Sequence, residues 1–102
     1  MPKTLYSEEA KLLQRQLRDA REQAGITQAS LSEAMGRGQS FISDIERGVR
    51  RLDVVELWFL CNALGLDLTS FVGEFQKAVE SRPGKRIKRL RRNDESLPRK
   101  RS

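Results

Sequence analysis

The sequence predicts one all-α domain of five helices, followed by a basic C-terminal segment that we expect to be disordered. Its 102 residues allow a single compact core. Apolar residues recur three or four positions apart in successive stretches, which is the period of an α-helix. A glycine follows four of these stretches, and glycine readily takes the left-handed conformation that ends a helix. These glycines are Gly25, Gly36, Gly48 and Gly65.

The first two helices are predicted over residues 7–24 and 28–35. The longer helix carries its apolar residues on one face and charged residues on the other. The shorter helix follows Thr27, whose hydroxyl is a preferred N-cap. The apolar faces consist of Ala10, Leu13, Leu17, Ala20 and Ala24 in the first helix, and of Leu31, Ala34 and Met35 in the second.

Only Gly36-Arg37-Gly38 separates the second helix from a third, which we predict from Gln39 to Arg47. The spacing of Ile42 and Ile45 directs both side chains inward. Two short helices joined by a three-residue turn that contains glycine are typical of a helix-turn-helix. The outer face of the third helix is polar and consists of Gln39, Ser40, Ser43, Asp44 and Arg47.

The last two helices are predicted from about Asp53 to Leu64 and from Asp67 to about Ser81. Asp53 can cap the fourth helix, and Glu56 three residues later completes a capping box. Pro83-Gly84 stops the fifth helix, because proline cannot continue the hydrogen-bond ladder. The predicted buried faces consist of Val54, Leu57, Leu60, Cys61 and Leu64, and then of Leu68, Phe71, Val72, Phe75 and Val79.

The composition argues against an enzyme, a membrane protein and a secreted protein. The chain has no histidine, and its single cysteine, Cys61, cannot form a zinc site alone. No apolar run approaches the roughly 18 residues of a membrane span, and the N-terminus lacks the pattern of a secretory signal. We therefore expect a soluble, cytoplasmic protein without metal or cofactor. We interpret Cys61 as a core residue rather than a redox switch.

The excess positive charge is confined to the C-terminal segment. Residues 1–80 hold ten Lys/Arg and twelve Asp/Glu (10 − 12 = −2), whereas residues 81–102 hold ten and two (10 − 2 = +8). We divide the chain into a helix-turn-helix domain over residues 1–81, with its core at about 13–72, and a basic tail over residues 82–102. The tail is either a solvated segment or an added grip on DNA phosphates. The residues that would make such contacts are Lys85, Arg86, Lys88, Arg89, Arg91 and Arg92.

Two motifs, GITQASLSEAMG at residues 25–36 and QSFISDIERG at residues 39–48, resemble the lambda-repressor and Cro-like family of helix-turn-helix regulators, of the xenobiotic-response-element type. The resemblance extends from about Leu13 to Phe71 and includes RRLDVVE at the entry to the fourth helix. It implies a five-helix lambda-repressor-like domain that binds pseudo-palindromic operators in double-stranded DNA as a homodimer. It also implies a protein that is bacterial or phage-encoded and nucleoid-associated. Two departures from the family are Ser32, where alanine is usual, and Arg37-Gly38, where an apolar residue and a capping Ser or Thr are common.

The predicted base contacts lie at the start of the third helix. Gln39 can present both amide groups to adenine N6 and N7, so we expect it to be the leading base reader. Ser40 and Ser43 lie on the same face but discriminate weakly between bases. Phe41 either touches a thymine methyl group or packs against the domain. Asp44 either accepts a hydrogen bond from cytosine N4 or orients a neighbouring arginine without touching a base.

The predicted contacts to the DNA backbone surround this helix. Gln28 stands at the start of the second helix, where free N–H groups favour a phosphate and where the resemblance places a glutamine contact. Glu46 is expected to hold the fold, paired with an arginine. The predicted backbone contacts are Thr27, Gln28, Arg37, Arg47, Arg50 and Arg51.

Four large apolar residues exceed what the core of so small a domain requires: Trp58, Phe71, Phe75 and Val79. They either form a two-fold dimer interface or complete the core. We expect a transcriptional regulator that represses, because a domain without a second module can block a promoter by occupying it. The alternative is an antitoxin that binds both its operator and a toxin protein. A nuclease would need a metal-binding carboxylate cluster, and Asp53 and Glu56 are better explained as a helix cap.

Overall fold

The computed structural model describes residues 7–82, which form five helices and no strand. The predicted contacts of the basic tail, at residues 85–92, lie outside these residues. The helices are α1 (Glu8–Gln23), α2 (Gln28–Ala34), α3 (Phe41–Glu46), α4 (Val54–Leu64) and α5 (Leu68–Glu80). The all-α, five-helix fold class is therefore confirmed.

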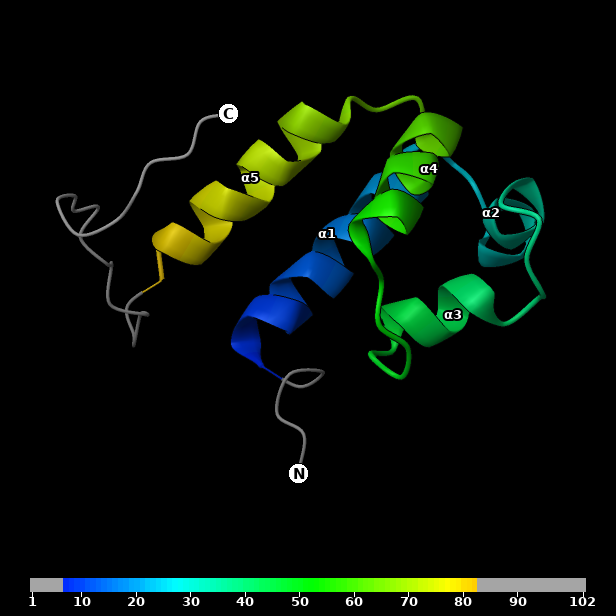
Figure 1. The fold of residues 1–102 in the computed structure, drawn as a ribbon, viewed down its shortest axis with the longest axis horizontal. Helices are drawn as coiled ribbons and strands as arrows, with labels where there is room; N and C mark the ends of the chain where they lie inside the picture. The colour runs from blue at the N-terminus through cyan, green and yellow to red at the C-terminus, as the bar shows by residue number, and fades with distance from the viewer. Residues whose placement is uncertain (1–6, 83–102) are drawn as a thin grey trace, which may run out of the picture.

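Helix α1 is the central element of the arrangement. It contacts α3 on one side and α5 on the other, while α2 packs against α3 and α4, and α4 packs against α5. Figure 1 shows α1 and α5 side by side, with the end of α5 close to the start of α1. The pair α2 and α3 lies at the opposite edge of the molecule (Figure 1). The helix-turn-helix is thus displayed at one edge and supported by α1 and α4.

The predicted helix boundaries depend on capping, and most of them are confirmed. The side chains of Ser7, Thr27 and Asp67 accept hydrogen bonds from backbone N–H groups in the first turns of α1, α2 and α5. Asp53 and Glu56 form the expected capping box at the start of α4. All four glycines that we expected to end helices have positive φ, between 69° and 79°. The local chemistry of caps and glycines therefore fixes where most helices begin and end.

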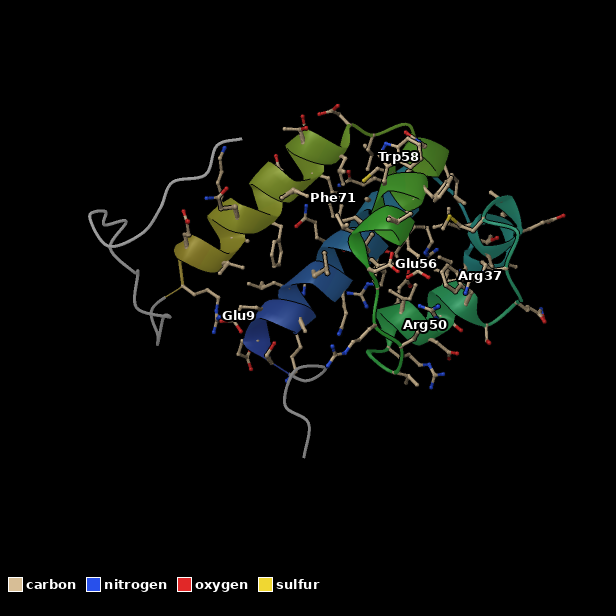
Figure 2. All side chains as sticks on the ribbon, viewed as in Figure 1. Glu9, Arg37, Arg50, Glu56, Trp58 and Phe71 are labelled. Atoms are coloured by element: carbon tan, nitrogen blue, oxygen red, sulfur yellow. The ribbon has the colours of Figure 1, made fainter. Side chains whose placement is uncertain are left out.

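The core lies where α1, α3, α4 and α5 meet. Its buried apolar residues are Leu17, Leu31, Phe41, Ile42, Ile45, Leu57, Leu60, Cys61 and Phe71. The prediction that Val54 of α4 and Val72 of α5 are buried is wrong, because their side chains are 65% and 39% exposed. Phe71 points toward α1 from α5 (Figure 2) and is buried, so the prediction that it contributes to a dimer interface is also wrong.

In the described part of the chain, no single helix is long and apolar enough to cross a membrane. Helices α4 and α5 meet the length and composition criteria only as a pair, and that pair is bent by 112°. No group of three or more cysteine, aspartate or glutamate side chains between residues 7 and 82 is arranged to hold a metal ion.

Helix α3 begins at Phe41, two residues later than predicted. Gln39 and Ser40 form a turn before it, and the Ser40 side chain makes no capping hydrogen bond. The cap comes from α2 instead, because the Ser32 hydroxyl oxygen accepts a hydrogen bond of 3.1 Å from the Ile42 N–H. Ser32 is only 1% exposed, so water cannot replace this bond. The serine that departs from the family pattern therefore joins the two helices of the motif.

Replacing Ser32 with alanine is expected to lower the free energy of unfolding by about 1–2 kcal/mol, because the Ile42 N–H would lose its partner inside the protein. Urea denaturation at equilibrium measures the change. The matched control is Ser30→Ala, an exposed serine in the same helix, whose loss should matter by less than about 0.5 kcal/mol. Equal effects of the two substitutions would contradict the capping role of Ser32.

Candidate nucleic-acid interface

The polar outer face of α3 is present as predicted, together with the turn that precedes it. Ile42 and Ile45 are buried, as expected. Gln39 and Ser40 are exposed, and Ser43 is half-buried. The Ser43 hydroxyl donates to the Ser40 carbonyl oxygen at 3.1 Å, so its lone pairs remain available as acceptors. The exposed turn and the first turn of α3 therefore present one glutamine amide and two serine hydroxyls at the edge of the domain.

Asp44 forms an ion pair with Arg47, with 2.6 Å between Oδ1 and Nη2. This contact supports the interpretation in which Asp44 orients a neighbouring arginine. The Asp44 carbonyl oxygen also accepts from the N–H groups of Val49 and Arg50, which turn the chain away from α3. The Arg47 side chain remains mostly exposed beside the polar face.

Phe41 packs in the core, so the prediction that its ring touches a thymine methyl group is wrong. The side chain is only 6% exposed. Two guanidinium groups lie over its ring, with the central carbon of Arg37 at 4.2 Å from the centroid and that of Arg50 at 4.7 Å. Both guanidinium groups also bond to the Glu56 carboxylate, at 3.3 Å and 3.1 Å. We call these four residues the Phe41 cluster; Figure 2 labels three of them, Arg37, Arg50 and Glu56.

The Phe41 cluster was not predicted as a unit, because sequence assigns Glu56 to the cap of α4 alone. Glu56 also accepts from the Asp53 N–H within that cap. Partial burial opposes its charge, but the Asp53 N–H and the two arginines outweigh burial and lower the pKa of the carboxyl. The cluster therefore connects α4 to the turn before α3 and to the loop after it. An aromatic residue between two arginines was the only sequence signal that could have indicated it.

Glu46 is the arginine-paired residue that we expected, and its partner is Arg21 of α1. The two side chains form two hydrogen bonds, at 2.7 Å from Nε and 3.1 Å from Nη2, and both are nearly buried. The bond to Glu46 raises the pKa of Arg21, although burial opposes it. Nη1 of Arg21 donates to the Ile26 carbonyl oxygen at 2.8 Å. This buried pair joins the end of α3 to α1 and to the chain entering α2.

Gln28 donates from Nε2 to Glu46 Oε1 at 2.8 Å, which places its side chain between α2 and α3. The second Nε2 hydrogen remains to donate to a phosphate oxygen. Thr27 accepts from the Ser30 N–H at 3.0 Å and therefore serves as a cap. Arg50 donates to the Arg51 carbonyl oxygen at 2.7 Å. The predicted cationic residues Arg37, Arg47, Arg50 and Arg51 lie in α3's C-cap and in the two segments that flank α3.

Cys61 belongs to the core, as we interpreted it. Its side chain is buried among the apolar residues of α4 and its neighbours. Burial raises the pKa of the thiol, and the charge of Asp67 adds to this effect. The thiol therefore remains protonated and poorly reactive at neutral pH.

Breaking the buried pair by Glu46→Gln should lower the free energy of unfolding by about 3–5 kcal/mol, because the nearly buried charge of Arg21 would keep, among the described residues, only the exposed Glu22 carboxylate, at 3.8 Å, as a counterion. Asp44→Asn, which breaks an exposed ion pair of the same helix, should cost less than about 1 kcal/mol. Denaturant unfolding compares the two. Similar losses would contradict a special role of the Glu46 pair.

The lowered pKa of Glu56 predicts a loss of stability in acid. A carboxyl whose pKa is lower in the folded state contributes stability above its ordinary value of 4.5, and this contribution disappears as pH falls through the lower folded value. As the pH is lowered from about 7 to about 3, the free energy of unfolding should therefore fall more steeply for the natural chain than for Glu56→Gln. Parallel pH profiles would argue against charged Glu56 as the centre of the Phe41 cluster.

Comparison with known proteins places this geometry in a family. A helix-turn-helix family model matches residues 17–71, which is more than half of the chain. An XRE-family like protein from Pseudomonas syringae pv. tomato is 37% identical, with 74% of this chain and 93% of that chain covered and a TM-score of 0.68. A search of curated protein sequences finds no match.

Two further solved structures are similar in fold. The clp gene regulator ClgR from Corynebacterium glutamicum is 26% identical, with 71% and 77% of the two chains covered and a TM-score of 0.63. The restriction-modification controller protein C.Esp1396I, in a complex of its tetramer with its natural 35 base-pair operator, is 23% identical, with 74% and 99% covered and a TM-score of 0.65. From the family model and the XRE-family relative together, the chain belongs to the XRE family, the lambda-repressor-like family of helix-turn-helix DNA-binding transcriptional regulators.

Proposed function

We propose that this regulator binds a pseudo-palindromic operator as a homodimer, with α3 in the major groove, and that it represses transcription. The observation that carries the proposal is the exposed polar start of α3, which stands at one edge of the domain between arginine-bearing segments. A helix presented in this way fits the width of the major groove.

Base reading is assigned to the turn and first turn of α3. Gln39 is exposed and precedes the helix, and no other residue between 7 and 82 forms a hydrogen bond with its side-chain amide. Its donor and acceptor match adenine N7 and N6. Ser40 and Ser43 contribute weaker hydrogen bonds to base edges. Asp44 acts through Arg47, because the ion pair between them holds the guanidinium beside the polar face.

Affinity must come from local cations, because the described domain is slightly acidic. Residues 7–82 hold ten Lys/Arg and twelve Asp/Glu (10 − 12 = −2). We assign phosphate contacts to Arg37, Arg47, Arg50 and Arg51, which flank the polar face, and to Gln28 and Thr27 at the start of α2. The basic segment over residues 85–92 is proposed to add contacts to phosphates that do not depend on base sequence.

We place the dimer interface on the outer face of α4. Val54, Val55, Trp58 and Phe59 share this face and are 65%, 58%, 47% and 51% exposed. The opposite face of α4 carries the buried core residues Leu57, Leu60 and Cys61, so apolar residues lie on both sides of the helix, and its only polar residues are Glu56 and Asn62. A helix of that kind is normally covered on all sides, which favours a second copy as the cover. On α5, Phe75 and Val79 are half-buried, so they contribute less surface than predicted.

Repression follows from occupancy. A dimer bound across an operator blocks access to an overlapping promoter without any further domain. The operator complex formed by the tetramer of C.Esp1396I supports an assembly of several copies on DNA for a protein of this fold.

Selection of bound fragments from random double-stranded DNA tests base reading. The natural chain should enrich a pseudo-palindrome, and Gln39→Ala should lose preference at one symmetric pair of positions, with a penalty there of about 1–3 kcal/mol. Ser70→Ala, far from α3, is the control and should keep the full pattern. A pattern unchanged by Gln39→Ala would overturn the assignment.

Sedimentation at tens of micromolar tests the dimer face. Phe59→Glu should convert the dimer to a monomer, because it would bury a charge in an apolar interface. Val49→Glu makes the same kind of change at an equally exposed residue outside α4 and should leave the dimer intact. A natural chain that is monomeric both with and without operator would refute the dimer, and a dimeric Phe59→Glu variant would refute this face.

A further inference from the structure

A groove of about 420 Å³ lies between α1 and the beginning of α5, far from the polar face of α3. Its apolar lining consists of Ala20, Leu66 and Phe71, and its charged lining consists of Asp19, Asp67 and Glu74. None of the lysines and arginines between residues 7 and 82 lines it. The groove therefore suits an occupant that is positively charged and carries apolar side chains.

Two of the three carboxylates are not engaged by the fold. Asp67 caps α5 through the Ser70 N–H. Asp19 and Glu74 form no ion pair or side-chain hydrogen bond with any other residue between 7 and 82. Like charges around one groove repel each other, and a cationic occupant would relieve that repulsion.

The chain itself contains a segment with the matching chemistry. Residues 85–92 read KRIKRLRR, with six basic residues, no acidic residue and two apolar residues, Ile87 and Leu90. We propose that this segment docks intramolecularly in the groove between α1 and α5. Its basic side chains pair with Asp19 and Glu74, while Ile87 and Leu90 contact the apolar lining.

The path is short enough for this contact. Arg82 is the last described residue, and its Nη1 atom lies 3.6 Å from Oε2 of Glu9 in α1. The described chain therefore ends beside the contact between α1 and α5. Pro83-Gly84 is a pair of residues that favours a reversal of direction. Measured along α5 from Arg82, the far end of the groove at Asp67 is about 22 Å away, because a helix rises 1.5 Å per residue. Eight extended residues span about 26 Å, which covers that distance.

Docking has a consequence for the proposed function, on which this part of the inference rests. Cations held in the groove are not available to DNA phosphates. Binding to nonspecific DNA is therefore weakened, because the DNA must compete with the groove for residues 85–92. At an operator, the contacts of α3 hold the domain on the DNA and let the segment transfer to nearby phosphates.

Zero-length carbodiimide cross-linking of the full chain without DNA tests the docking alone. Lys85 or Lys88 should become joined to Asp19 or Glu74 within single chains, as detected by mass spectrometry. The yield should fall in Ile87→Ser/Leu90→Ser, which keeps both lysines and both carboxylates but removes the apolar contacts. It should remain in Glu8→Gln/Glu80→Gln, which removes one charge from each of the same two helices outside the groove. No such product, or products only between chains, would overturn intramolecular docking. Because no DNA is present, this failure is distinct from failure of the DNA-binding proposal.

Affinity for a random-sequence duplex, measured by fluorescence anisotropy, tests the competition. Asp19→Asn/Glu74→Gln should strengthen binding about three-fold more than the control pair does. In a chain whose six basic residues at 85–92 are replaced with glutamine, the groove variant and the control variant should change the affinity for the duplex equally, because no docked cations remain to be released. An equal effect of the two pairs in the natural chain would overturn the competition.

Discussion

The carboxylate of Glu46 lies between three helices, and the placement of α3 depends on it. One oxygen accepts from Arg21 of α1, and the other accepts from both Arg21 and Gln28 of α2. Helix α3 has only six residues, too few to be stable without tertiary contacts. Its direction is therefore set by the buried pair at its end and by the Ser32 bond at its start. A buried ion pair adds little net stability over apolar residues, so its value here is that it fixes one orientation.

The electrostatic design separates specificity from affinity. Around α3, Arg37 and Arg50 share Glu56, and Arg47 pairs with Asp44, so the reading surface carries few uncompensated charges. These carboxylates hold the guanidinium groups in place and also reduce their attraction for any polyanion. The surplus positive charge is in the C-terminal segment, where the groove between α1 and α5 offers it a second partner. On our proposals for α3 and for residues 85–92, the regulator binds weakly to random DNA and relies on base contacts to remain at its operator.

The sequence predicted those features that depend on neighbouring residues. The caps at Thr27 and Asp53 and the glycines with positive φ are local, and they were found where expected. Features that depend on distant residues were missed. The cap of α3 comes from Ser32, ten residues before its partner, which shifts the start of the helix to Phe41.

Apolar periodicity also did not predict which element or second chain covers each apolar helix face. It gives the angle of a side chain around the helix but not what covers it. Phe71 therefore fitted both core and interface, and Val54 was assigned to the wrong side of α4. The convergence of two arginines on Phe41 and Glu56 required the three-dimensional path of the chain, since Arg37 and Glu56 are far apart in sequence.

The central claim is that Gln39 reads a base in the major groove from the start of α3. The most direct measurement replaces the adenine preferred by the natural chain with 7-deazaadenine, which lacks the N7 acceptor, and compares affinities of the natural chain and of Gln39→Ala. The account predicts a loss of about 5- to 10-fold for the natural chain and no loss for the variant. An equal loss for both chains would contradict it.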